Sequence, residues 1–159
     1  MQTKERVLIH KGMDKVKQGQ YTEAVEIFDK ILSTNPQNTF AWNNRGVALF
    51  KAGRPDEAIQ SYDRSLEIDP ENLEALRNKG FVLRSADRLE EALECYALVI
   101  KAGGNAKDME SLATVLVGMN RLDEAMECML QADELQPNGV FEEEIAALKS
   151  MIEQRDQAK

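Results

Sequence analysis

The chain has few of the residues that commonly bind metal ions, form disulfide bonds or act as nucleophiles: among 159 residues there are one histidine and two cysteines. It also has one tryptophan. Two cysteines do not make a disulfide framework. Cys95 and Cys128 are therefore interpreted as small apolar side chains in a reducing compartment.

Long apolar runs are also missing. No stretch approaches the ~18 apolar residues that a membrane-spanning helix needs. The first fifteen residues contain an apolar run of only three, which is too short for a signal peptide. We therefore expect a cytoplasmic protein that does not contact membranes.

Positive charge is in deficit, because 28 acidic residues outnumber 20 basic ones and give a formal net charge of −8. Proteins that bind nucleic acids draw most of their affinity from Lys and Arg that neutralise phosphates. The charge balance therefore argues against a nucleic-acid partner.

What the sequence does have is a repeat. Ala24, Ala58, Ala92 and Ala125 are separated by 34, 34 and 33 residues, and other columns follow the same period. A small residue stands twelve positions before each of these alanines, a large residue four positions after it, and a Pro or Gly near the end of each copy. The copies span 5–38, 39–72, 73–105 and 106–139, and a tail follows.

Each copy is predicted to form two helices. In the second copy, Gly53 is typical of a helix C-terminus, Pro55 of the first helical position, and Pro70 of a helix end. A glycine inside a helix costs about 1 kcal/mol relative to alanine, so Gly46 needs a compensating close approach. We expect it to lie against Ala58, while large residues such as Trp42 and Tyr62 fill the angles between successive hairpins.

The second copy, "TFAWNNRGVALFKAGRPDEAIQSYDRSLEIDPEN", resembles the tetratricopeptide repeat family almost throughout. The resemblance covers about residues 5–139. It implies an all-α fold, a right-handed superhelical array of four helix-turn-helix hairpins plus a C-terminal capping helix. The family usually has leucine just before the helical glycine, whereas this chain has Lys11, Arg45 and Lys79. The third copy lacks its proline and turn glycine, so we expect irregular geometry where it joins the fourth.

The tail is predicted to be a helix over about 140–157, because Phe141, Ile145, Leu148 and Ile152 recur at helical spacing. A polar cap over the fourth hairpin is the simple interpretation, and a helix that docks onto another molecule is the alternative. The whole chain, 1–159, is then a single domain.

In the family that the chain resembles, the first helix of each hairpin lines a concave groove. The positions that line it hold six Lys or Arg and two Glu, a charge opposite in sign to that of the whole chain. The groove residues that we expect to bind a peptide are His10, Lys17, Phe40, Asn43, Asn44, Val47, Lys51, Arg77, Asn78, Phe81, Arg84 and Lys107. Some family members hold a terminal carboxylate with a Lys-Asn-Asn-Lys-Arg set, but only Asn44 matches that set here.

The sequence contains no phosphate-loop, dinucleotide-binding or zinc-protease motif. His10 lies in the first copy and both cysteines in the third or fourth, so an array in which each unit touches only its neighbours keeps them apart. We expect no enzyme, cofactor or metal. The predicted function is a non-catalytic adaptor that binds an acidic peptide segment of another protein.

The alternative is a structural or assembly subunit that associates weakly with itself through the tail helix and the fourth copy. Methionine adapts well to such surfaces, although filling a core is its commoner use. The methionines concerned are Met109, Met119, Met126 and Met129.

Overall fold

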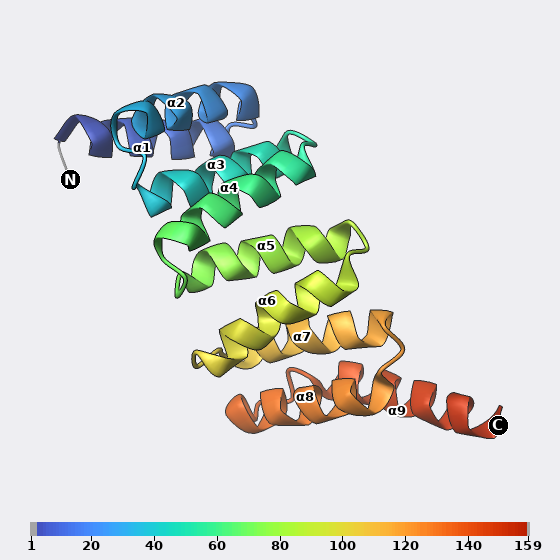
Figure 1. Ribbon diagram of the computed structural model, residues 1–159. Coiled ribbons are helices and arrows are strands. Elements are labelled where there is room, and N and C mark those ends of the chain that lie inside the picture. The colour runs from blue at the N-terminus through green and yellow to red at the C-terminus, as the bar shows by residue number, and fades with distance from the viewer. Residues whose placement is uncertain (1–2, 159) are drawn as a thin grey trace. The chain divides into compact units, whose positions relative to one another are not determined.

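The computed structural model describes residues 3–158, and in that range the secondary structure is entirely helical. The helices are α1 (Thr3–Lys17), α2 (Tyr21–Thr34), α3 (Thr39–Lys51), α4 (Pro55–Ile68), α5 (Leu73–Ser85), α6 (Leu89–Lys101), α7 (Ala106–Gly118), α8 (Leu122–Leu135) and α9 (Glu142–Gln157). Figure 1 shows α1 beside α2, α3 beside α4 and α7 beside α8. The all-α class and the helical hairpins are confirmed.

The chain divides into two compact units, Met1–Ala86 and Asp87–Lys159. Unit 1 holds α1 to α5, and unit 2 holds α6 to α9. The division falls in the connection between α5 and α6, within the third sequence repeat. We expected irregularity at the next connection, between α6 and α7, where the third repeat joins the fourth. The single domain over 1–159 stays a prediction.

The four turns inside the repeats share one backbone feature. Gly19 and Gly53 have φ of 76° and 77°, and Asp87 and Asn120 both have φ of 58°. This left-handed conformation costs glycine nothing, and asparagine and aspartate tolerate it better than other residues. The third copy therefore keeps the turn with Asp87 in place of glycine.

The helix ends follow the local chemistry. Pro55 lies at the start of α4, as predicted, with Asp56 and Glu57 in the first turn. The asparagines before α3 and α5, Asn38 and Asn72, cap those helices by accepting hydrogen bonds from backbone N–H groups of the first turn. These caps fix where the first helix of a repeat begins.

The helical glycines make room for aromatic rings. A Cβ atom on Gly46 would lie 2.5 Å from the Tyr62 ring, and one on Gly12 would lie 2.8 Å from the Phe28 ring. The prediction for Tyr62 was therefore wrong, because its ring fills the space inside its own hairpin and not the angle between hairpins. Ala58 is fully buried, but it is not the group that requires the glycine.

Trp42 lies where the second repeat meets the end of the first. Its indole N–H donates to the Pro36 carbonyl at 2.8 Å, and the guanidinium groups of Arg45 and Arg64 each lie 5.8 Å from its ring centroid. The ring is half-buried, and these two arginines make cation–π contacts with it.

The charged residues that replace the family's leucine join successive repeats of unit 1. Arg45 of α3 pairs with Asp29 of α2 at 2.7 Å, and Lys79 of α5 pairs with Asp63 of α4 at 2.7 Å. Both pairs recur at the repeat period of 34 residues. The departure from the family pattern is therefore a repeated ion pair.

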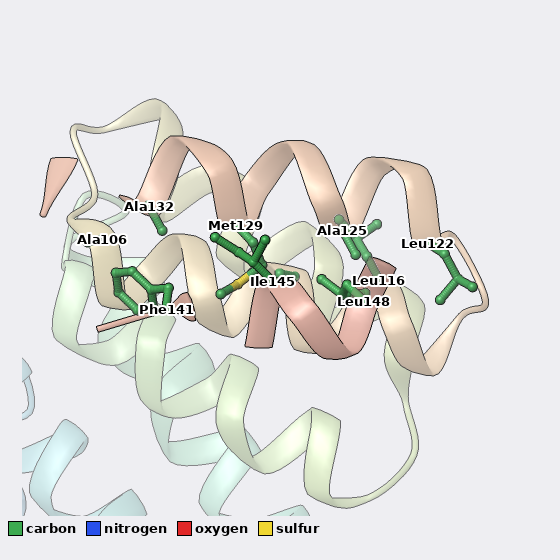
Figure 2. Close-up of a cluster of buried hydrophobic side chains, with 10 residues drawn as sticks. Ala106, Leu116, Leu122, Ala125, Met129, Ala132, Phe141, Ile145 and Leu148 are labelled. Atoms are coloured by element: carbon green, nitrogen blue, oxygen red, sulfur yellow. The ribbon is translucent and has the colours of Figure 1, made fainter. Parts of the chain in front are cut away.

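Unit 2 has its own apolar core, which includes α9. Phe141, Ile145 and Leu148 belong to one buried cluster with side chains of α7 and α8 (Figure 2). Arg155 adds a bidentate pair with Asp123 of α8, at 2.7 and 3.2 Å. The predicted tail helix is confirmed, and its apolar stripe covers the fourth hairpin.

The methionines of the fourth copy serve this core more than a surface. Met129 is 2% exposed, and Met109 and Met126 are partly buried against the cluster. Core filling leaves Met119, at the end of α7, as the one methionine of the four outside the cluster. Self-association through the tail helix and the fourth copy stays a prediction, and Met129 is not available for it.

Candidate functional site

The predicted groove residues fall into both units. Eleven of the twelve lie in unit 1, on the first helices of successive repeats, where α1 contacts α3 and α3 contacts α5. We call the side of these helices that carries the predicted residues the α1/α3/α5 face. It holds His10, Lys17, Phe40, Asn43, Asn44, Val47, Lys51, Arg77, Asn78, Phe81 and Arg84. Lys107 lies on α7 in unit 2 and pairs with Glu110 at 2.7 Å, so we leave it out of this face.

Asn43 forms the most buried part of the α1/α3/α5 face, with 1% of its surface exposed. Its side-chain oxygen accepts a hydrogen bond from the Asn78 amide of α5 at 3.0 Å. Among the described residues its own amide nitrogen has no hydrogen-bond partner. A buried donor without a partner costs about 1–3 kcal/mol, so this atom calls for an explanation.

The other predicted asparagine is already engaged. The Asn44 amide donates to the Phe40 carbonyl, one turn earlier on α3, at 2.8 Å. One amide hydrogen and the side-chain oxygen of Asn44 are still available to a ligand, and the Asn78 amide, which donates to Asn43, is engaged in the same way. Asn43 differs from both, because its amide nitrogen has no hydrogen-bond partner among the described residues.

Apolar surface lies next to these amides. The Phe81 ring of α5 is 44% exposed and meets the Phe50 ring of α3 edge-on, with centroids 5.6 Å apart. The Arg84 guanidinium lies 5.5 Å from the Phe81 ring centroid. Phe40 is 36% exposed at the other end of α3. Together these rings offer contact area beside a cation.

The basic groups of the face differ in how they are engaged. Lys51 is exposed and has no ion-pair partner among the described residues. Lys17 lies 3.8 Å from Asp14, with both side chains well exposed. An exposed pair of this kind is worth about 1 kcal/mol or less, so it leaves Lys17 accessible to a competing carboxylate. Val47 and Arg77 are half-buried, and His10 is exposed.

A pocket of about 250 Å³ lies in unit 2, and its lining comes from α7, α8 and α9. On α7 the lining includes three positions of the fourth copy that the family resemblance places in the groove: Glu110, Thr114 and Val117. The contributions of α8 and α9 were not predicted, because the apolar spacing of the tail predicted the helix but not which side of the fourth hairpin it covers.

The Cys128 thiol is not activated as a nucleophile. Burial raises the pKa of the Cys128 thiol, and the nearby Glu127 and Glu124 raise it further, which keeps the thiol protonated. The described residues contain no cluster of three or more His, Cys, Asp or Glu that could hold a metal ion. Within the same residues no helix has the length and apolarity to cross a bilayer.

The helical repeats match models of a known protein family. Models of the tetratricopeptide repeat (TPR) match residues 10–72, 49–112 and 109–138. The chain belongs to the tetratricopeptide repeat family. Its TPR matches cross the boundary between the two units, because the second runs from α3 into α7.

Several solved TPR structures share the fold. MamA 41-end from Desulfovibrio magneticus RS-1 is 21% identical, with a TM-score of 0.77, covering 100% of this chain and 99% of that one. The first TPR of Spaghetti (RPAP3), bound to the HSP90 peptide SRMEEVD, is 24% identical, with a TM-score of 0.69 and coverages of 73% and 93%. YrrB, a TPR protein with an unusual peptide-binding site, is 26% identical, with a TM-score of 0.71 and coverages of 80% and 66%. No curated protein matches the chain.

Proposed function

We propose that this TPR protein is a non-catalytic adaptor whose α1/α3/α5 face binds an acidic, extended segment of another protein. The observation that carries the proposal is the unpaired, buried amide nitrogen of Asn43 beside Asn78. A carbonyl group of a bound backbone would supply the missing acceptor after a small movement of the side chain.

The charge of the face supports an acidic ligand. Arg84 lies over the exposed Phe81 ring, and the face also carries Lys51 on α3, Arg77 on α5 and Lys17 on α1. Complementary charge speeds association and rejects partners of the wrong sign. The RPAP3 domain binds a peptide, SRMEEVD, that carries three carboxylate side chains. The cytoplasmic location stays a prediction from the sequence.

The test uses two labelled pools of short random peptides, one built from Asp, Glu and apolar residues and the other from Lys, Arg and apolar residues. Fluorescence anisotropy measures their binding to the full chain. The double variant Lys51→Glu with Arg84→Glu should bind the acidic pool about tenfold more weakly or worse, which is about 1.4 kcal/mol. Higher salt should weaken the native interaction, because both side chains meet solvent.

The control variant, Lys101→Glu with Lys149→Glu, changes the net charge by the same amount at exposed positions of unit 2. It should leave binding of the acidic pool nearly unchanged. Equal losses in the two variants would mean that the pool responds only to net charge, and the proposed face would then be wrong.

A further inference from the structure

The pocket of unit 2 has a mainly apolar wall formed by three helices. Val117 of α7, Met129 of α8, and Leu148 and Met151 of α9 contribute to it. Met129 and Leu148 also belong to the buried cluster in Figure 2, so packing holds these two side chains in place. Met151 is 40% exposed and, being flexible and polarizable, adapts to the shape of whatever binds.

The size of the pocket favours side chains of a macromolecule over a small-molecule ligand. Its volume of about 250 Å³ lies below the roughly 300–1,000 Å³ that is usual for small-molecule sites. A partner segment that inserts one large apolar side chain needs less room. The remaining contact would then lie along the rim.

The rim is acidic. Glu144, in the first turn of α9, is exposed and has no ion-pair partner among the described residues. Glu110 of α7 is engaged by Lys107, with distances of 2.7 and 2.9 Å. Helix N-termini favour carboxylates, which accounts for Glu at this end of α9, but the charge of Glu144 faces the pocket mouth without a counter-charge.

The surroundings have the same sign. Residues 87–159 hold 16 acidic and 7 basic side chains, whereas residues 1–86 hold 12 acidic and 13 basic. The whole negative charge of the chain therefore belongs to unit 2. An acidic rim in an acidic unit attracts a basic segment and repels the acidic ligand proposed for unit 1.

We propose that this pocket is a second docking site, which takes a basic segment of a partner protein. The segment inserts one large apolar side chain against Val117, Leu148 and Met151, and places a Lys or Arg beside Glu144. The site differs from the α1/α3/α5 face in its unit, its helices and the sign of its charge. One chain then holds two partners of opposite charge.

The test measures anisotropy of the basic peptide pool with matched variants of the full chain. Glu144→Lys should weaken binding by about tenfold or more, or about 1.4 kcal/mol. Glu143→Lys makes the same charge change in the same helical turn but outside the pocket lining, so it should have a much smaller effect. Equal effects would overturn the proposal, because they would show only attraction to an acidic unit.

A second variant tests the apolar part without changing charge. Ala147 lines the pocket and is exposed, so Ala147→Leu should narrow the pocket, leave the fold intact and weaken binding of the basic pool. Leu135→Gln, at a residue that is 59% exposed outside the pocket, serves as the control. Unchanged binding by Ala147→Leu would contradict the proposal.

Two further outcomes separate this site from the one in unit 1 and from self-association. The double variant Lys51→Glu with Arg84→Glu should keep its affinity for the basic pool, whatever happens to the acidic pool. Sedimentation should show a monomer in the native chain. A concentration-dependent oligomer that Ala147→Leu dissolves would mean that a second copy fills the pocket, which would overturn the assignment to a partner protein.

Discussion

Unit 1 and unit 2 use the same repeat but join their repeats by different chemistry. In unit 1 the Asp29–Arg45 and Asp63–Lys79 pairs bridge one repeat to the next. The equivalent positions in unit 2 are Ala97 and Leu112, and Leu112 packs against the apolar core. The repeat therefore fixes the backbone and leaves the junction open to either a charged or an apolar pair.

The units also differ in how the small residue of the hairpin is used. In unit 1, Gly46 makes room for the rigid Tyr62 ring, which is 1% exposed. In unit 2 the position equivalent to Gly46 is Ala113, which is compatible with the flexible Met129 at the position of Tyr62. An aromatic ring demands glycine, whereas methionine accepts a methyl group.

The largest expected effect comes from adding a methyl group in each unit. Gly46→Ala should lower the free energy of unfolding by about 1–3 kcal/mol, because its Cβ would overlap the buried Tyr62 ring. Gly118→Ala should be nearly neutral, because its Cβ would meet only the end of the flexible Leu89 side chain, 3.0 Å away. Chemical unfolding followed by circular dichroism measures both.

Trp42 lies in unit 1 and is the only tryptophan of the chain, so its fluorescence reports unit 1. The loss of unfolding free energy in Gly46→Ala should appear in the Trp42 signal. In a Tyr62→Leu background, Gly46→Ala should cause a smaller loss of unfolding free energy. A loss in Gly118→Ala as large as that in Gly46→Ala would show that the aromatic contact does not set the difference.

The next effect concerns the turns. Gly53→Ala should cost about 1 kcal/mol, because alanine at φ of 77° is strained. Asn120→Gly should be neutral or stabilise by a few tenths of a kcal/mol, because asparagine already tolerates the conformation. Thermal unfolding compares the two, and a stabilised Gly53→Ala variant would contradict the role of the left-handed turn.

A smaller effect depends on pH. Burial raises the pKa of Tyr62 above its ordinary value of about 10. The native state therefore holds this proton more tightly than the unfolded chain does, and unit 1 should lose stability as pH rises above about 10, at most about 1.4 kcal/mol per pH unit. Tyr62→Phe should remove this part of the alkaline loss in the Trp42 signal. The same pH dependence in the variant would show that other groups cause it.

The sequence predicted the helices well, because Gly53, Pro55 and Pro70 mark their ends and the alanine period sets the copies. It did not predict the division after Ala86: the missing turn glycine of the third copy was visible, but Asp87 takes the same backbone conformation, and the irregularity was expected at the next junction. Packing partners were harder still. The neighbour of Gly46 depends on how Tyr62 turns inward, which spacing alone does not determine.

The candidate site was predictable only in part. The repeat positions gave the α1/α3/α5 face, but the engagement of Asn44 by Phe40 and the burial of Asn43 depend on side-chain geometry. The pocket of unit 2 was predictable on α7, where Glu110, Thr114 and Val117 stand at groove positions, but not on α9, whose placement beside the fourth hairpin the sequence does not give. A periodic apolar stripe predicts that a helix is packed against other helices, but it does not identify those helices.

The most direct test of the central claim, two docking surfaces of opposite charge in one chain, is an NMR titration of the labelled full chain. The acidic peptide pool should shift amide signals of α1, α3 and α5, and the basic pool should shift those of α7 and α9. If both pools shifted signals of the same helices, or if the shifts were spread evenly over all the helices, the claim of two separate docking surfaces would be contradicted.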